Sequence, residues 1–244
     1  MGTPALETRL ALRERPARTP VMFQRWEDLL FLHWEADPAA LQRTLPPGLH
    51  VDLFQGRAYL GIVPFRMRRV RPRGLPAVPW LSDFLEFNVR TYVHDESGKP
   101  GVWFYSLDCD QPLAVWIART FFHLPYFHAA LSASNETGTI RFNSRRRAAA
   151  PAEAAFAYRR GAALETAAPG SLEFFLVERY VLYAFRAGHL LRGRVHHSPY
   201  PLCETELHTC RLTGLTGLAA LTDSPVHALA SPGVDVEIFG LERA

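Results

Sequence analysis

The sequence predicts a mainly β (α+β) fold, built on a large antiparallel sheet or barrel. Three observations support this. Short segments rich in β-branched and aromatic residues are separated by turns that contain glycine or proline. Only two or three short segments carry helix start signals, so the strands and helices do not alternate as a parallel sheet requires. Finally, a chain of 244 residues that is 48% hydrophobic and 21% charged is large enough to bury a sizeable core.

The chain is expected to form one domain preceded by a short arm. Residues 1–20 end in PARTP, where two prolines oppose helix continuation, so we interpret them as an N-terminal arm of helical character. Residues 21–244 show neither an internal repeat nor a low-complexity tract, which favours a single domain. The sequence contains no apolar run of about 18 residues and its start lacks the apolar core of a signal peptide. We therefore expect a cytoplasmic protein without membrane contact.

The first elements after the arm are a strand and a short helix. Residues 29–36 are predicted to be a mostly buried strand. Residues 37–45 are predicted to be a helix, with Asp37 as its N-cap and Pro38 at its first position.

Two hairpins are expected next. Segments 49–54 and 57–70 are predicted to pair across a Gln55-Gly56 turn, and a proline-rich loop follows to about residue 82. Segments 84–93 and 101–108 are predicted to form the second hairpin.

The second half of the chain contains a helix and several strands. Asp110 and Pro112 are expected to open a helix that Pro125 ends. A helical turn is predicted to begin at Ser171. The strand candidates are residues 138–144, 155–160, 179–186, 190–197, 203–212 and 234–239.

Charge and cysteine content exclude some classes of protein. The net charge is +3, Lys99 is the only lysine, and arginines cluster in residues 66–73 and 144–147. No nucleic-acid-binding motif accompanies these clusters, so we interpret them as solvated faces and expect no nucleic-acid partner. Three cysteines without CxxC spacing indicate neither a disulfide framework nor a zinc ribbon.

The most informative segment is FLEFNVRTYV, residues 84–93. Side chains alternate along a strand, so Glu86, Asn88, Arg90 and Tyr92 share one face. That face is either solvent-exposed or the wall of a polar pocket. In a barrel, the opposite apolar face would pack under helices and the polar face would line the cavity.

Histidines are the other candidates for chemistry. His196 and His197 are adjacent on a predicted strand and point to opposite faces, so only one of them can face a pocket. Each is either an acid/base group or a hydrogen-bonded structural residue. His123 and His128 are five residues apart with a proline between them, which is not a helical metal-binding spacing. We therefore expect no metal site and no cofactor.

Several segments carry a family resemblance. They are DPAALQRTLPPGLHVD, YLGIVPFRM, GVWFYSLDCDQPLAVWIARTFFHLPYFHA, ERY and RGRVHHSPYPL, in this order. With them, the chain resembles the uncharacterised YqjF-like family of the acetoacetate-decarboxylase-like superfamily over residues 23–239. The resemblance implies a cone-shaped antiparallel β-barrel around a small-molecule cavity, flanked by two or three short helices.

The same resemblance implies that one chemistry is missing. Acetoacetate decarboxylases form a Schiff base through a lysine beside a second lysine. Tyr126 and Phe127 stand where that pair would be, and neither side chain forms an imine. Glu86 corresponds to a catalytic-site glutamate of the decarboxylases. Their carboxylate-binding arginine aligns near Glu27, so another arginine would have to take that role.

We hypothesise that the protein binds a small polar or anionic organic molecule without Schiff-base chemistry. The expected cavity residues are Glu86, Arg90, Arg119, Tyr126, His196 and Tyr200.

Two alternatives remain open. The first is a lyase or hydrolase acting on a keto-acid-like substrate, with His196 or His197 as base and Glu86 or Tyr126 as acid. The second is a non-catalytic interaction protein that uses an arginine-rich hairpin. A homodimer is compatible with each of these hypotheses.

Overall fold

The computed structural model describes residues 3–147, 152–214 and 224–244 and confirms a mainly β fold with short helices. The helices are α1 (Leu6–Ala11), α2 (Pro38–Gln42), α3 (Pro112–Ile117), the π-helical turn η1 (Ala118–Phe122) and α4 (Leu172–Val177). The strands are β1 (Met22–Ala36), β2 (Leu49–Val51), β3 (Ala58–Pro72), β4 (Phe84–Asp95), β5 (Pro100–Cys109), β6 (Tyr126–Glu136), β7 (Thr139–Arg146), β8 (Glu153–Ala163), β9 (Val181–Arg186), β10 (His189–His196), β11 (Cys203–Thr213), β12 (His227–Ile238) and β13 (Glu242–Arg243). None of the helices in these ranges is long and apolar enough to cross a membrane.

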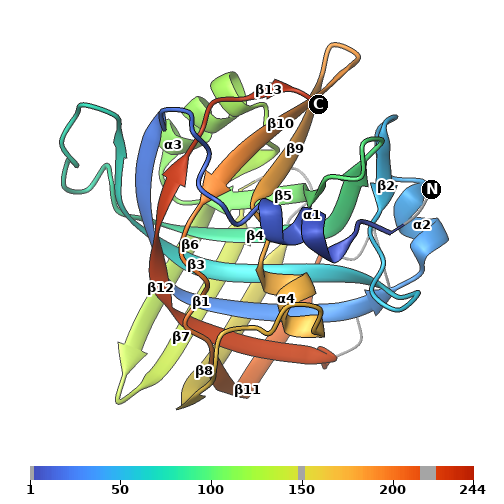
Figure 1. Ribbon diagram of the computed structural model, residues 1–244. Helices are drawn as coiled ribbons and strands as arrows, with labels where there is room; N and C mark the ends of the chain where they lie inside the picture. The colour runs from blue at the N-terminus through green and yellow to red at the C-terminus, as the bar shows by residue number, and fades with distance from the viewer. Residues whose placement is uncertain (1–2, 148–151, 215–223) are drawn as a thin grey trace.

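The strands form one sheet that closes on itself. Its order is β13-β10-β9-β5-β6-β7-β8-β11-β12-β1-β3-β4-β2, and β4 also pairs with β5, which closes a barrel of nine strands. A further pairing joins β10 to β12, so β9 and β10 complete a second ring over the same central strands β12, β1, β3, β4 and β5 (Figure 1). Most pairings are antiparallel, but β5 runs parallel to both β6 and β9.

Because two rings share the central strands, these strands are buried on both faces. On β4, Phe87 and Val89 belong to a core cluster that includes Phe142 of β7 and Phe156 of β8. Tyr92 belongs to a second cluster, which includes residues of α4. The expectation that helices cover the apolar face of this segment is therefore wrong, because the strands beyond β5 fold back over that face.

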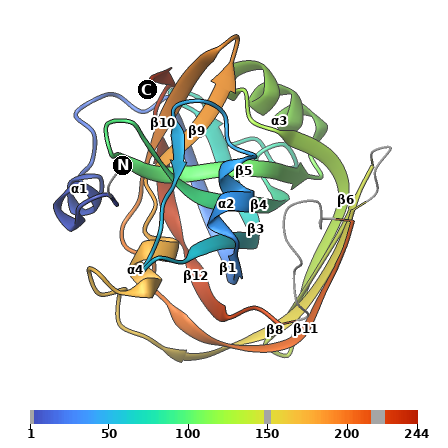
Figure 2. The same ribbon diagram turned by 90° about the vertical axis from the view of Figure 1, so that its right-hand side faces the viewer.

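The N-terminal arm and α2 lie outside the barrel. The Asp37 carboxylate accepts hydrogen bonds from the backbone N–H groups of Ala39 and Ala40, which confirms the predicted N-cap of α2. In the arm, Arg9 of α1 donates two hydrogen bonds of 2.8 and 2.7 Å to the buried Asp52 carboxylate. Figure 2 shows α1 and α3 on opposite sides of the barrel. The arm is thus attached to the barrel by a partly buried ion pair.

One predicted hairpin does not form. Residues 49–54 and 57–70 share only an isolated bridge between Phe54 and Arg57. Instead, β2 pairs antiparallel with the end of β4, and the Asp52 N–H donates to the carbonyl of Tyr92. Gln55 and Gly56 do form a turn, but β2 pairs with β4 and not with the strand that follows this turn.

The hairpin of β4 and β5 is confirmed, and so is a helix ending before Pro125. The Gln111 side chain caps this helix, because the Asp110 carboxylate accepts the Leu85 N–H instead. The helix finishes in η1, where His123 adopts a left-handed conformation with φ of 53°. Strand β6, which then begins at Tyr126, was not predicted.

Candidate functional site

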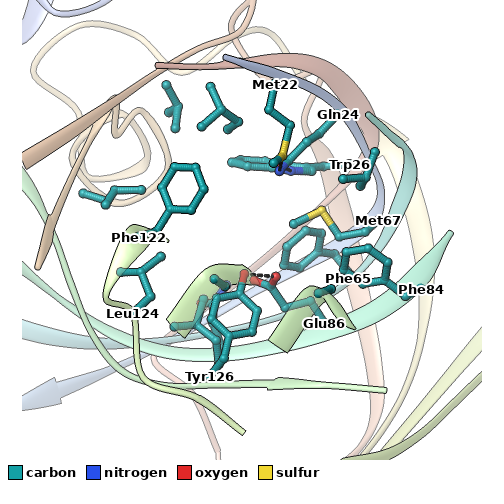
Figure 3. A pocket seen from close by; sticks show the side chains of 18 of the residues that line it. Met22, Gln24, Trp26, Phe65, Met67, Phe84, Glu86, Phe122, Leu124 and Tyr126 are labelled. Carbon is teal, nitrogen blue, oxygen red and sulfur yellow. Dashed lines mark hydrogen bonds between the residues drawn. The ribbon is translucent and has the colours of Figure 1, made fainter. Parts of the chain in front are cut away.

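A cavity of about 430 Å³ lies inside the ring that contains β9 and β10. Side chains of β1, β3, β4, β5, β6, β9, β10 and β12 line it, together with α3, η1 and the loop after β3. Most of them are apolar, and Figure 3 shows Phe65, Met67, Phe84, Phe122 and Leu124 around the space. Its size and lining are typical of a small-molecule site.

The loop after β3 and helix α3 form the most exposed part of the cavity wall. Leu75 and Val78 of the loop and Leu113 of α3 line the cavity and are exposed to solvent. The Gln111 side chain donates to the backbone carbonyl of Trp80 and so joins the helix to the loop. These two elements therefore form the solvent-exposed side of the cavity.

Polar side chains of β4 project into the apolar space. Glu86, Asn88 and Arg90 all line the cavity, whereas Phe87 and Val89 face the other core. The alternation predicted from the sequence is therefore the arrangement in the structure. All three polar side chains are buried, so their charges and dipoles act in a medium of low dielectric constant.

Glu86 and Tyr126 form a hydrogen-bonded pair in the cavity wall (Figure 3). The Tyr126 hydroxyl donates to Oε2 of Glu86 over 2.6 Å. Burial raises the pKa of Glu86 to about 7, although the hydrogen bonds from Tyr126 and Asn88 favour its ionised form. Burial and the neighbouring Glu86 charge raise the pKa of Tyr126. Near neutral pH, the carboxyl group is thus present in both protonation states.

Arg90 is a buried cation that forms no ion pair with an acidic side chain of the described residues. Its side chain is in the cavity wall, and its Nε and Nη2 atoms have no hydrogen-bond partner among the described residues. The guanidinium carbon lies 5.9 Å from the ring centre of Phe31 and 5.8 Å from that of Tyr92. Buried charges in proteins are usually paired, because an unpaired one is costly to remove from water.

Arg179, which also lines the cavity, provides a contrast. Its Nη1 donates to the Asp52 carboxylate over 2.7 Å, and its Nε donates to the Phe175 carbonyl. Burial lowers the pKa of Arg179 to about 10. Arg179 is thus paired with an acid of the same chain, whereas no acid among the described residues pairs with Arg90.

Comparison with known proteins identifies the family. Residues 23–235 match the family DUF2071, described as an uncharacterized conserved protein. The uncharacterized protein YqjF of Bacillus subtilis (strain 168) is 40% identical over 210 residues, which are 84% of this chain and 86% of the relative. The chain belongs to the DUF2071 family. The resemblance predicted from the sequence is confirmed.

Solved structures show that this DUF2071 protein has the acetoacetate-decarboxylase-like fold. The enduracididine biosynthesis enzyme MppR, solved with pyruvate, is 16% identical, with a TM-score of 0.62 over 94% of this chain and 93% of that one. An acetoacetate decarboxylase-like enzyme of Sphingomonas wittichii RW1 is 14% identical, with a TM-score of 0.63 over 93% and 94% of the two chains. The acetoacetate decarboxylase of Legionella pneumophila is 15% identical, with a TM-score of 0.62 over 94% and 91%.

No lysine of this DUF2071 chain lies in the cavity. The single lysine, Lys99, is in the turn between β4 and β5, where its N–H donates to Asp95 and its carbonyl accepts from Tyr183. Tyr126 faces the cavity. Phe127, the next residue, stacks under the Arg146 guanidinium at 4.3 Å, outside the cavity wall.

The structure brings together four of the six expected cavity residues. Glu86, Arg90, Tyr126 and Tyr200 line the cavity. Arg119 does not, because it lies on the exposed side of η1. His196 does not either, because the alternation of β10 directs it outward to a polar groove, 3.6 Å from Glu237. The cavity positions expected for Arg119 and His196 are corrected accordingly.

His197, the other histidine candidate, is buried beside Tyr200. It stacks on Tyr180 with ring centres 4.7 Å apart, and its Nδ1 is 2.7 Å from the Ser198 carbonyl. Burial lowers the pKa of His197 to about 4, so it is neutral near pH 7. It lines the polar groove and not the cavity, so it does not share a pocket with Glu86.

Sequence reasoning missed Arg179, Gln24 and Trp26 as cavity residues. Arg179 begins a predicted strand and is part of the ERY segment, which was the only available signal. Gln24 and Trp26 precede the residues at which β1 was predicted to begin. No three His, Cys, Asp or Glu side chains in the described ranges come together as a group that would hold a metal ion.

Proposed function

We propose that this protein binds a small organic acid in the cavity, with the carboxylate of the ligand at Arg90 and its apolar part against the aromatic and aliphatic wall. The buried guanidinium of Arg90 carries this proposal, because its Nε and Nη2 atoms have no hydrogen-bond partner in the part of the chain that the structure describes. A planar guanidinium binds a carboxylate through two parallel hydrogen bonds, and such a contact is strong where water is excluded.

The rest of the wall supports an anion with an apolar body. Phe31 and Tyr92 lie beside the guanidinium, and aromatic and aliphatic side chains make up most of the lining. The Tyr200 hydroxyl is a further donor for a ligand oxygen, since no hydrogen bond of the described residues uses it. MppR, which shares the fold, was solved with pyruvate, a small carboxylate.

Binding without a Schiff base follows from the absence of a lysine in the cavity. The amine needed for an imine is missing there, because Lys99 is in a turn outside the wall. We expect reversible binding of the acid, held by charge and apolar contact alone.

The arginine clusters favour this proposal over an interaction protein. In the cluster of residues 66–73, Arg66 pairs with Asp28 at 3.0 Å and Arg68 with Glu27 at 3.7 Å. Their charges are partly neutralised within the chain, which leaves less positive charge for an acidic partner.

The test compares acids with matched neutral molecules. Isothermal titration with octanoate, 3-phenylpropionate and the corresponding primary amides measures whether a carboxylate is required. We expect the acids to bind at least tenfold more tightly than the amides. Substitution Arg90→Gln should weaken acid binding at least tenfold, whereas Arg43→Gln, at an exposed position, should leave it unchanged. Equal binding of acids and amides, or an Arg90→Gln protein that binds acids like the wild type, would refute the proposal.

A further inference from the structure

The Glu86–Tyr126 pair has a chemical capacity that binding alone does not use. A carboxyl group and a phenol share one short hydrogen bond of 2.6 Å, both side chains line the cavity, and both are buried. Among the described residues, no cation forms an ion pair with Glu86, so its charge is not fixed by a neighbour in the way that Asp52 is fixed by Arg179. Such a pair can take a proton from one atom and give a proton to another.

We propose that Glu86 and Tyr126 catalyse the keto–enol tautomerisation of a bound oxo acid, by transferring a proton from the carbon beside the carbonyl group to the carbonyl oxygen. This inference rests on the proposed function, because Arg90 would hold the carboxylate of the same molecule.

The step balances without a further reactant. The free carboxylate oxygen of Glu86 removes the proton from the carbon beside the carbonyl, and the electron pair of the broken C–H bond forms the C=C bond. The carbonyl π electrons become a bond between oxygen and the proton that Tyr126 donates. The proton on Glu86 then passes to the Tyr126 oxygen, so both side chains return to their initial state. Nothing is oxidised or reduced.

The environment suits both halves of this step. Near neutral pH, part of the protein has an ionised Glu86 that can accept a proton, because burial holds its pKa close to 7. Once Glu86 is protonated, its charge no longer opposes loss of the Tyr126 proton. Asn88, on the same face of β4, has a buried Oδ1 atom that accepts no hydrogen bond from any residue that the structure describes. This acceptor can orient a donor group of the ligand or the hydroxyl of the enol.

The spacing of the groups defines the class of oxo acid. Glu86 and Arg90 are four residues apart on one strand, so their Cα atoms are about 13 Å apart. The Arg90 guanidinium lies beside the ring of Tyr92, which is farther from Glu86 along β4. We therefore expect a carbonyl group at Glu86 and a carboxylate at Arg90 to be joined by several carbon atoms. Medium-chain oxo acids with a carbonyl group remote from the carboxylate meet this condition, and the apolar wall suits their methylene chain.

The experiment measures proton exchange on carbon. The probes are 2-oxooctanoate, 4-oxooctanoate and 7-oxooctanoate in D₂O, and proton NMR follows deuterium incorporation next to the carbonyl. An enol released to solvent exchanges its hydroxyl proton and carries deuterium back to carbon. We expect exchange of 7-oxooctanoate to be at least about 100-fold faster than in buffer, in the range of acid–base catalysis. Exchange of 2-oxooctanoate should be slower than this.

Variants separate catalysis from binding. Glu86→Gln should reduce the enzymatic exchange at least about 100-fold, and Tyr126→Phe at least tenfold. Both should still bind 7-oxooctanoate by calorimetry. Glu35→Gln, which alters a surface glutamate paired with Arg57, should exchange like the wild type.

The two proposals fail in different ways. If the oxooctanoates bind to the wild type but none exchanges faster than in buffer, or if Glu86→Gln and Tyr126→Phe both exchange at the wild-type rate, tautomerisation is refuted and acid binding stands. If none of the three binds while octanoate does, tautomerisation is refuted and acid binding stands. If octanoate does not bind either, both proposals are refuted.

Discussion

Replacing Glu86 by glutamine should change how the stability of the protein depends on pH. The pKa of Glu86 is raised from 4.5 to about 7 by burial, so the folded protein binds this proton more tightly than the unfolded chain does. The resulting stabilisation is complete below pH 4.5 and is lost as the pH rises through 7. From these two values, linkage gives a loss of about 2.5 kcal/mol between about pH 5 and about pH 8.

Glutamine keeps the size of the side chain and an oxygen that can accept the Tyr126 hydroxyl, but it does not titrate. The free energy of unfolding of wild type minus that of Glu86→Gln should therefore fall by about 2.5 kcal/mol from about pH 5 to about pH 8. The buried His33 and His197 and the half-buried His227 also titrate, but they are present in both proteins, so the difference isolates Glu86.

Urea denaturation followed by circular dichroism, at several pH values, measures this difference. The linear extrapolation requires a single cooperative transition, which near- and far-ultraviolet signals should report at the same urea concentration. If the two proteins show parallel pH profiles, Glu86 does not carry a raised pKa, and the account of its environment is wrong.

Three further predictions concern charge, backbone and lysine chemistry. Asp52→Ala should lower the free energy of unfolding by about 3–5 kcal/mol, because it leaves the buried Arg179 unpaired. Urea denaturation measures this loss, and the double variant Asp52→Asn/Arg179→Met should regain much of it. A loss below about 1 kcal/mol in Asp52→Ala would contradict this prediction. Gly233→Ala should lower the free energy of unfolding by about 2 kcal/mol or more, because φ is +138° and the new Cβ would overlap the Trp26 carbonyl. Gly56→Ala, where the new Cβ meets open space, should lower it less in the same assay. When the protein is incubated with pyruvate and then reduced with borohydride, its intact mass should not change, because its only lysine, Lys99, lies in a turn outside the cavity. A reduced pyruvate adduct on Lys99 would contradict this prediction.

Local patterns in the sequence were sufficient to predict several features. Alternation along a strand placed Glu86, Asn88 and Arg90 on one face, because successive side chains of any strand point to opposite sides. Asp37 followed by Pro38 predicted the start of α2, because a cap acts only on the next few residues. These interactions span a few residues and do not depend on the rest of the fold.

Strand partners depend on contacts that the sequence does not place side by side. A good turn at Gln55-Gly56 made a local hairpin the expected outcome, yet β2 pairs with β4. Strand β6 was missed although it forms part of the barrel, since a segment beginning PYFHAALSAS has a weak alternating pattern of its own. In both places, burial against distant strands outweighs local preference.

Some features of the candidate site can likewise be predicted from the sequence, whereas others depend on the fold. Its residue types, the absence of a lysine pair and the polar face of β4 were present in the sequence alone. The hydrogen bond between Glu86 and Tyr126, which are 40 positions apart, exists because β4 and β6 both border β5 in the closed barrel. Likewise, only the fold pairs Arg179 with Asp52 while no acid of the described ranges pairs with Arg90. A side chain's partner, its burial and hence its pKa are set by the elements packed around it, and those elements come from the whole chain.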